Sequence, residues 1–156
     1  MAQQSTEYGY RSGPIQNYTF PVGASEVFKK KGGPFVIVDG SGRVEIAAAG
    51  ELNIIGAAMI NEDFTASATE GETKVPVNLS QEAVYEVPIN TGTWADTMRG
   101  EACDLSVVSD IQGVDLTASG EDVVILVDKG TTNTAGTVVS VLCRLNPTAL
   151  AQTGVV

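Results

Sequence analysis

The sequence contains no histidine and only two cysteines among its 156 residues. The missing histidines remove the commonest general base and the commonest zinc ligand of proteins. Cys103 and Cys143 stand in apolar surroundings, and two thiols cannot complete a four-ligand zinc site. We expect both cysteines to be buried free thiols, and a disulfide between neighbouring strands is the alternative.

Basic residues are also scarce, since nine Lys and Arg face nineteen Asp and Glu and the formal net charge is −10. Nucleic-acid binding replaces phosphate counterions with Lys and Arg, so this charge predicts no nucleic-acid partner. The longest apolar runs (35–38, 54–60 and 123–127) are far shorter than the roughly 20 residues of a membrane span. The N-terminus lacks a signal-peptide pattern. We therefore expect no membrane association, and assembly in the cytoplasm.

Residues 1–14 are polar and include two glycines and Pro14, a composition typical of a flexible, extended arm. From residue 15 onward, short alternating or apolar segments are separated by turn sequences such as DGSG, NTGT and ASGED. This pattern predicts an all-β domain over 15–147, a small β-barrel or β-sandwich, with a C-terminal tail over 148–156. The expected strands are 15–20, 35–38, 43–47, 54–60, 73–78, 83–89, 103–108, 122–128 and 137–145.

Helical spacing is found only over 24–30, 80–86 and 93–101, for one or two turns each. In the second of these segments we favour a strand, because residues 84–89 alternate with a period of two. The sequence therefore predicts at most short helical turns between the strands.

The glycine-rich loop DGSG at 39–42 resembles a nucleotide-binding loop, but it leads into the alternating segment RVEIA. A P-loop requires Lys followed by Ser or Thr and a helix, so we predict a hairpin turn instead. The acidic pair Glu62 and Asp63 lacks the spacing of a calcium loop, which favours a solvated loop over weak calcium binding.

Catalytic chemistry has little support in the sequence. A serine nucleophile without histidine would need a lysine as its base. Nineteen acidic residues would allow the carboxylate pair of a glycosidase, but such clefts are normally lined with aromatics, and the chain has one Trp, four Tyr and four Phe. We expect no enzyme activity, no catalytic residues, no cofactor and no metal site.

Two groups of residues are candidates for partner binding. The run Lys29, Lys30 and Lys31 is either a solvated loop that discourages pairing between sheet edges or a contact to an acidic partner. Tyrosine and arginine are enriched at the centres of interfaces. The N-terminal segment is therefore either a disordered tail or a strap that orders on a neighbouring subunit, through the candidate residues Tyr8, Tyr10, Arg11 and Tyr18. Trp94 is interpreted as a core plug or loop anchor, with a ligand platform as the alternative.

Three stretches together resemble a known family: GPFVIVDGSGRVEIAAAGELNIIGAAM, TKVPVNLSQEAVYEVPI and GEACDLSVVSDIQGVDLTASGEDVVILVD. Their succession of strands, glycines and turns is similar to that of the small β-barrel capsid decoration, or cement, proteins of tailed bacteriophages. The resemblance covers most of residues 15–147. It implies a β-tulip-like fold and a homo-oligomer, most often a trimer, on the outer surface of the virion. There it would bridge neighbouring major capsid protein subunits and stabilise the shell.

Two other functions stay open at this point. The first is another virion structural component, such as a tail, connector or minor capsid protein. A ligand-binding or carbohydrate-binding β-sandwich is the second alternative, and it would require an exposed aromatic platform.

Overall fold

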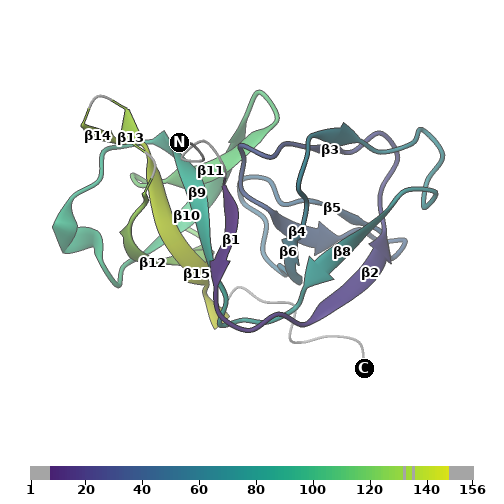
Figure 1. The fold of residues 1–156 in the computed structure, drawn as a ribbon, viewed down its shortest axis with the longest axis horizontal. Helices are drawn as coiled ribbons and strands as arrows, with labels where there is room; N and C mark the ends of the chain where they lie inside the picture. The colour runs from purple at the N-terminus through teal and green to yellow at the C-terminus, as the bar shows by residue number, and fades with distance from the viewer. Residues whose placement is uncertain (1–7, 132, 135, 148–156) are drawn as a thin grey trace.

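The computed structural model describes residues 8–131, 133–134 and 136–147, which form an all-β protein with two lobes (Figure 1). The first, here called the barrel lobe, contains β9 (Val84–Thr91), β10 (Ala102–Val108), β11 (Ile111–Asp115), β12 (Val124–Lys129) and β15 (Ser140–Leu145), with β1 (Gly9–Ser12) beside β9 and the hairpin β13 (Asn133–Thr134) and β14 (Thr137–Val138). The second, here called the sheet lobe, contains β2 (Asn17–Pro21), β4 (Phe35–Val38), β5 (Val44–Ile46), β6 (Gly56–Ala58) and β8 (Lys74–Asn78), with the pair β3 (Val27–Phe28) and β7 (Phe64–Thr65).

Five strands of the barrel lobe close into a ring. Strand β9 pairs with β11, β11 with β10, β10 with β12, β12 with β15, and β15 again with β9. Only the β9–β11 pair is parallel. The closed ring leaves few unpaired sheet edges, and β1 covers the start of β9 where β11 does not reach, which limits edge-to-edge aggregation. The predicted all-β fold is confirmed, and the pairing makes this lobe a small barrel.

The sheet lobe is an open five-stranded sheet in the order β2-β8-β6-β4-β5. Its two outer strands approach each other, because Val22 just after β2 bridges Val44 on β5, and the Gly23 amide donates to the Val44 carbonyl at 3.0 Å. The sheet therefore curls around its own core, which consists of Val22, Phe28, Val36, Val44, Ala58, Ala66, Val75 and Val77.

Alternation along the strands joins the two lobes. Successive side chains of a strand point to opposite faces. On β4, Val36 packs into the core of the sheet lobe, whereas Phe35 belongs to the core of the barrel lobe and meets the Tyr85 ring edge-on at 5.3 Å. Ala57 on β6 also belongs to the barrel core. The two faces of β4 thus contribute to two different cores.

A buried carboxamide reinforces this junction. Gln112 on β11 is 1% exposed, and its Nε2 donates to the carbonyls of Phe35 and Ala47 at 2.9 and 2.8 Å. Its Oε1 accepts from the Phe35 amide at 2.9 Å. The Gln112 side chain therefore makes hydrogen bonds to backbone groups of the sheet lobe that would otherwise need a neighbouring strand.

The nine predicted strands all occur, although 137–145 is divided into β14 and β15. The preference for a strand over 83–89 is confirmed by β9. The helical segments are corrected: 24–30 contains a turn followed by β3, and 93–101 holds only the 3-10 turn η2 (Asp96–Met98). Strands β1, β3, β7, β11 and β13 were not predicted.

The prediction of a flexible N-terminal arm is wrong for the part of that arm that the structure describes. Residues Gly9–Ser12 form β1, which pairs antiparallel with Val84, Tyr85 and Glu86 of β9. The pairing partners lie more than 70 positions later in the chain, so a local composition rule could not reveal them. Residues 1–7 and the predicted tail 148–156 lie outside the described residues.

Both cysteines are free and buried in the barrel core, as expected. Burial raises the pKa of Cys103 to about 12, with the charge of Asp104 adding to the effect, and burial also raises the pKa of Cys143. Because the thiolate is the reactive form, we expect a thiol reagent to label the native protein slowly and the unfolded protein completely at pH 8. Fast labelling of both cysteines in the native protein would contradict this burial.

The Gln112→Leu variant tests the junction between the lobes. It removes the hydrogen-bond partner of the Phe35 amide and of the Ala47 carbonyl, and a buried unpaired polar group costs about 1–3 kcal/mol. We expect urea denaturation to show a loss of roughly 3 kcal/mol in the free energy of unfolding. The matched control is Gln81→Leu, at an exposed glutamine, which should leave the midpoint unchanged. Equal stability of the two variants would show that Gln112 does not hold the lobes together.

Candidate partner-binding site

A cavity of about 380 Å³ lies between the N-terminal strand and the sheet lobe. Its lining comes from three segments of the chain: Tyr8, Gly9, Tyr10 and Arg11 in and before β1, Lys29, Lys30, Gly32 and Pro34 in the turn after β3, and Ala58, Met59, Ile60 and Asn61 at the end of β6. Aromatic, cationic and apolar side chains therefore meet in one hollow.

The lysines of this cavity stand on a turn that is fixed at both ends. The Gly32 amide donates to the Lys29 carbonyl at 3.0 Å, and the Lys30 amide donates to Asp63 Oδ1 at 2.6 Å. The Gly33 amide then donates to the Gln112 carbonyl at 2.7 Å. A Cβ on Gly33 would lie 2.6 Å from Gln112 Oε1, so only glycine permits this approach. The lysine turn is thus positioned by the lobe junction.

The opposite side of the cavity depends on an ion pair. Glu86 on β9 is fully buried, and Arg11 Nε donates to its Oε1 at 3.1 Å. Thr131 Oγ1 donates to the same oxygen at 2.7 Å, and Ser140 Oγ donates to Oε2 at 2.6 Å. The register of β1 shifts between Tyr10 and Ser12, as in a β-bulge, and bulges redirect side chains. Arg11 therefore neutralises a carboxylate inside the barrel lobe while it also lines the cavity.

The two tyrosines of this segment are held by the barrel lobe as well. The Tyr10 ring meets the Tyr85 ring edge-on, with the centroids 6.2 Å apart, and its hydroxyl donates to the Gly13 carbonyl at 2.6 Å. Burial raises the pKa of Tyr8, and the nearby Glu86 carboxylate raises it further. The Tyr8 phenol therefore stays neutral at physiological pH and offers a hydroxyl group for hydrogen bonding.

The charge of the cavity contrasts with that of the chain. Its lining contains Arg11, Lys29 and Lys30, and none of the described lining residues is acidic. These are three of only nine basic residues in a chain of net charge −10. Asp63 beside Lys30 reduces the local positive charge without lining the cavity. The hollow is therefore suited to an acidic partner group accompanied by apolar side chains.

Five of the seven residues singled out in the sequence line this cavity: Tyr8, Tyr10, Arg11, Lys29 and Lys30. Tyr18 instead lies on β2 and is 63% exposed, and Lys31 is exposed beside the cavity without lining it. Met59, Ile60 and Asn61 also line the cavity and were not predicted from the sequence. Met59 and Ile60 end a predicted apolar strand, and no local signal distinguishes them from the buried residues before them.

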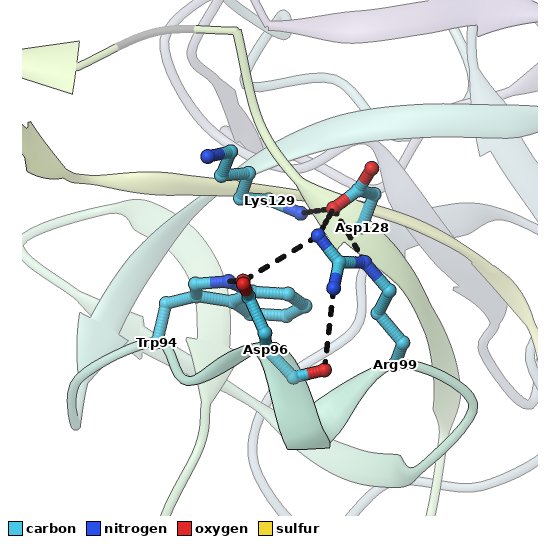
Figure 2. Close-up of polar contacts among 5 residues, drawn as sticks. All are labelled: Trp94, Asp96, Arg99, Asp128 and Lys129. Carbon is cyan, nitrogen blue, oxygen red and sulfur yellow. Dashed lines mark hydrogen bonds and ion pairs between the residues drawn. The ribbon is translucent and has the colours of Figure 1, made fainter.

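Trp94 anchors a loop rather than presenting a free ring face (Figure 2). Its Nε1 donates to Asp96 Oδ1 at 3.0 Å, and the Arg99 guanidinium lies 5.9 Å from its ring centroid. Arg99 in turn binds Asp128 on β12, with Nε 2.9 Å and an Nη 2.8 Å from Oδ1, and the Lys129 amide donates to the same oxygen. The ring also packs against the barrel core. These contacts tie the segment around η2 to β12 and agree with the loop-anchor interpretation.

The DGSG loop is the hairpin turn that the sequence predicts, since it joins β4 to β5. The Asp39 carboxylate accepts hydrogen bonds from the amides of Ser41 and Arg43 at 2.7 and 3.0 Å, and these bonds lower the pKa of Asp39. Gly42 has φ +82°, a conformation that glycine adopts without strain. The hydrogen bonds of Asp39 therefore stabilise the turn from within the loop.

Comparisons with protein-family models, with curated proteins and with solved structures found no match for this chain. Within the described residues, His, Cys, Asp and Glu form no group of three or more that could hold a metal ion. The same part of the chain contains no helix long and apolar enough to span a membrane. The cavity is therefore interpreted from its own residues.

The Arg11–Glu86 pair gives a direct test of how β1 is held. Removing one partner of a buried ion pair leaves an uncompensated charge, so Arg11→Gln should lower the free energy of unfolding by about 3 kcal/mol. The double variant Arg11→Gln with Glu86→Gln should recover part of this loss, because the buried carboxylate is then gone. The matched control, Arg99→Gln, breaks an exposed pair and should change the urea midpoint little. If Arg11→Gln is as stable as the control, the ion pair does not hold β1.

Proposed function

We propose that this protein is a capsid decoration protein of a tailed bacteriophage, which binds the outside of the assembled head. On the shell it bridges neighbouring major capsid protein subunits and stabilises them against internal pressure. One observation supports this beyond the sequence resemblance: Tyr8, Tyr10 and Arg11 meet Lys29 and Lys30 in a single cavity. Residues with the composition of an interface centre thus lie together on one surface hollow.

The chemistry of the cavity defines the partner group. An acidic side chain or loop of a capsid subunit would face Arg11, Lys29 and Lys30, while an apolar side chain beside it would contact Met59 and Ile60. Opposite charges on the two surfaces steer encounter and fix orientation more than they add affinity. The cations therefore determine which face of the protein docks. The apolar side chains of the lining contribute the apolar area that docking buries.

The overall charge fits the same role. A net charge of −10 disfavours binding to the packaged genome, whose phosphates are also negative. Many weak, identical contacts on one shell then stabilise the assembled state, because ligands that bind only that state shift its equilibrium by mass action. A homo-oligomer, with a trimer favoured, would multiply these contacts further.

Another virion component is the main alternative, and copy number separates the two: a decoration protein approaches the number of capsid subunits, whereas connector proteins form single rings. A carbohydrate-binding role is less favoured, because sugar platforms present open aromatic faces. Here Tyr10 packs its ring against Tyr85, and Trp94 is covered by Arg99.

The proposal is tested by mixing the purified protein with expanded shells and with free capsid subunits. We expect binding to shells only. In the triple variant Lys29→Gln, Lys30→Gln and Lys31→Gln, association should slow about tenfold at low salt and lose most of its salt dependence. The matched control is Lys74→Gln with Lys129→Gln, which removes two lysines that do not line the cavity.

The outcomes separate the function from the site. If the parent protein binds no shell, the capsid decoration proposal is wrong. If the parent binds shells and the triple variant binds with the same rate and salt dependence, the docking surface lies elsewhere on the molecule.

A further inference from the structure

Strand β1 is attached to a barrel that closes without it. The ring of β9, β11, β10, β12 and β15 is complete, and among the described residues β1 pairs with the first residues of β9 alone. Along the rest of β9, β11 pairs with Ile89 and Thr91. Strand β1 therefore fills a slot beside the start of β9, where the barrel would otherwise present an open strand edge.

The side chains in the slot fit a strand of particular sequence. It contains the buried Glu86 carboxylate, which the Arg11 side chain neutralises, and the Tyr85 ring, which receives the edge of Tyr10. An empty slot would leave that carboxylate without this cation inside the barrel lobe, which is strongly unfavourable. An extended segment with the order Tyr-Arg satisfies both groups, and β1 carries it.

The connection from β1 to β2 is short and conformationally restricted. Gly13 has φ +100°, and a Cβ there would lie 2.9 Å from the Ala83 Cα and from the Glu82 carbonyl oxygen. Pro14 follows at once, and its carbonyl accepts from Asn78 Nδ2 at 3.1 Å, while the Gln16 amide donates to Asn78 Oδ1 at 2.8 Å. Asn78 on β8 therefore holds the connection between β1 and β2 against the sheet lobe. The connection thus spans only residues 13–16, and short hinge segments favour exchange of the strand that they connect.

We propose that the slot accepts β1 from a second copy of the chain, so that two or more copies exchange their N-terminal strands. The exchanged strand makes the same contacts in either arrangement, so association costs mainly the freedom of the joined copies. High local concentration therefore favours exchange. In the exchanged form Tyr8, Tyr10 and Arg11 come from the neighbour, and the cavity is complete only when that copy is present. This inference holds whether or not the protein binds a capsid.

The test uses cysteines that can meet only between chains. Ser12 on β1 is the register partner of Val84 on β9. One full-length chain carries Ser12→Cys, the other carries Val84→Cys, and the two are incubated together at high concentration in a glutathione redox buffer. Exchange should give a disulfide-linked heterodimer, with about tenfold more product than random collision, because opposite strand positions bring the Cβ atoms within disulfide reach.

The matched control pairs Val84→Cys with Thr19→Cys, an exposed position on β2 that faces Pro76 instead of β9. Equal heterodimer yields from the two mixtures would overturn the proposal. If either variant fails to unfold cooperatively, the unmodified protein gives the answer. In a mixture of isotope-labelled and unlabelled chains, NMR contacts between Ser12 and Val84 of different chains support exchange, and contacts confined to single chains overturn it.

Discussion

Because the Gln112 side chain leaves the barrel and bonds the backbone of Phe35 and Ala47, the two lobes cannot slide past each other without unpairing buried polar groups. The backbone carbonyl of Gln112 also accepts a hydrogen bond from the Gly33 amide. This bond fixes the turn that carries Lys29 and Lys30. The position of the cationic cavity wall is therefore a consequence of the lobe junction. A substitution at Gly33 would displace this turn, because its Cβ would lie 2.6 Å from Gln112 Oε1, even though Gly33 does not line the cavity.

The second constraint is electrostatic and works inside the barrel lobe. A fully buried glutamate is costly unless it is paired and hydrogen-bonded, and Glu86 has Arg11, Thr131 and Ser140 for this purpose. Replacing a buried ion pair with hydrophobic residues is often neutral or stabilising, so we interpret the carboxylate as a source of specificity for one strand. It accepts β1 in a register that places an arginine beside it, and it disfavours a strand without a cation.

The sequence predicts most of the strands because period-two alternation is a local signal, and β5, β8 and β9 show it clearly. Strand β11 escapes prediction because Gln112 and Gly113 interrupt the apolar pattern for reasons found only in three dimensions. Gln112 faces the other lobe, and a Cβ on Gly113 would lie 2.7 Å from the Asn90 side chain. Composition singled out five of the residues that line the cavity, but it could not place them together. Their meeting depends on the β1–β9 pairing and on the lobe junction, both of which join distant parts of the chain.

The pairing of β1 also changes how binding by this segment should be viewed. A disordered strap must lose conformational entropy when it orders on a partner, and this loss lowers the affinity obtained per unit of buried area. Tyr10 and Arg11 are already held by Tyr85 and Glu86, so a partner that enters the cavity meets a wall whose side chains are largely fixed. Preorganisation of this kind lowers the cost of each contact. It also makes the affinity for that partner depend on the stability of β1 in its slot, so a change at Glu86, away from the cavity lining, would weaken binding by releasing the strand that forms one wall.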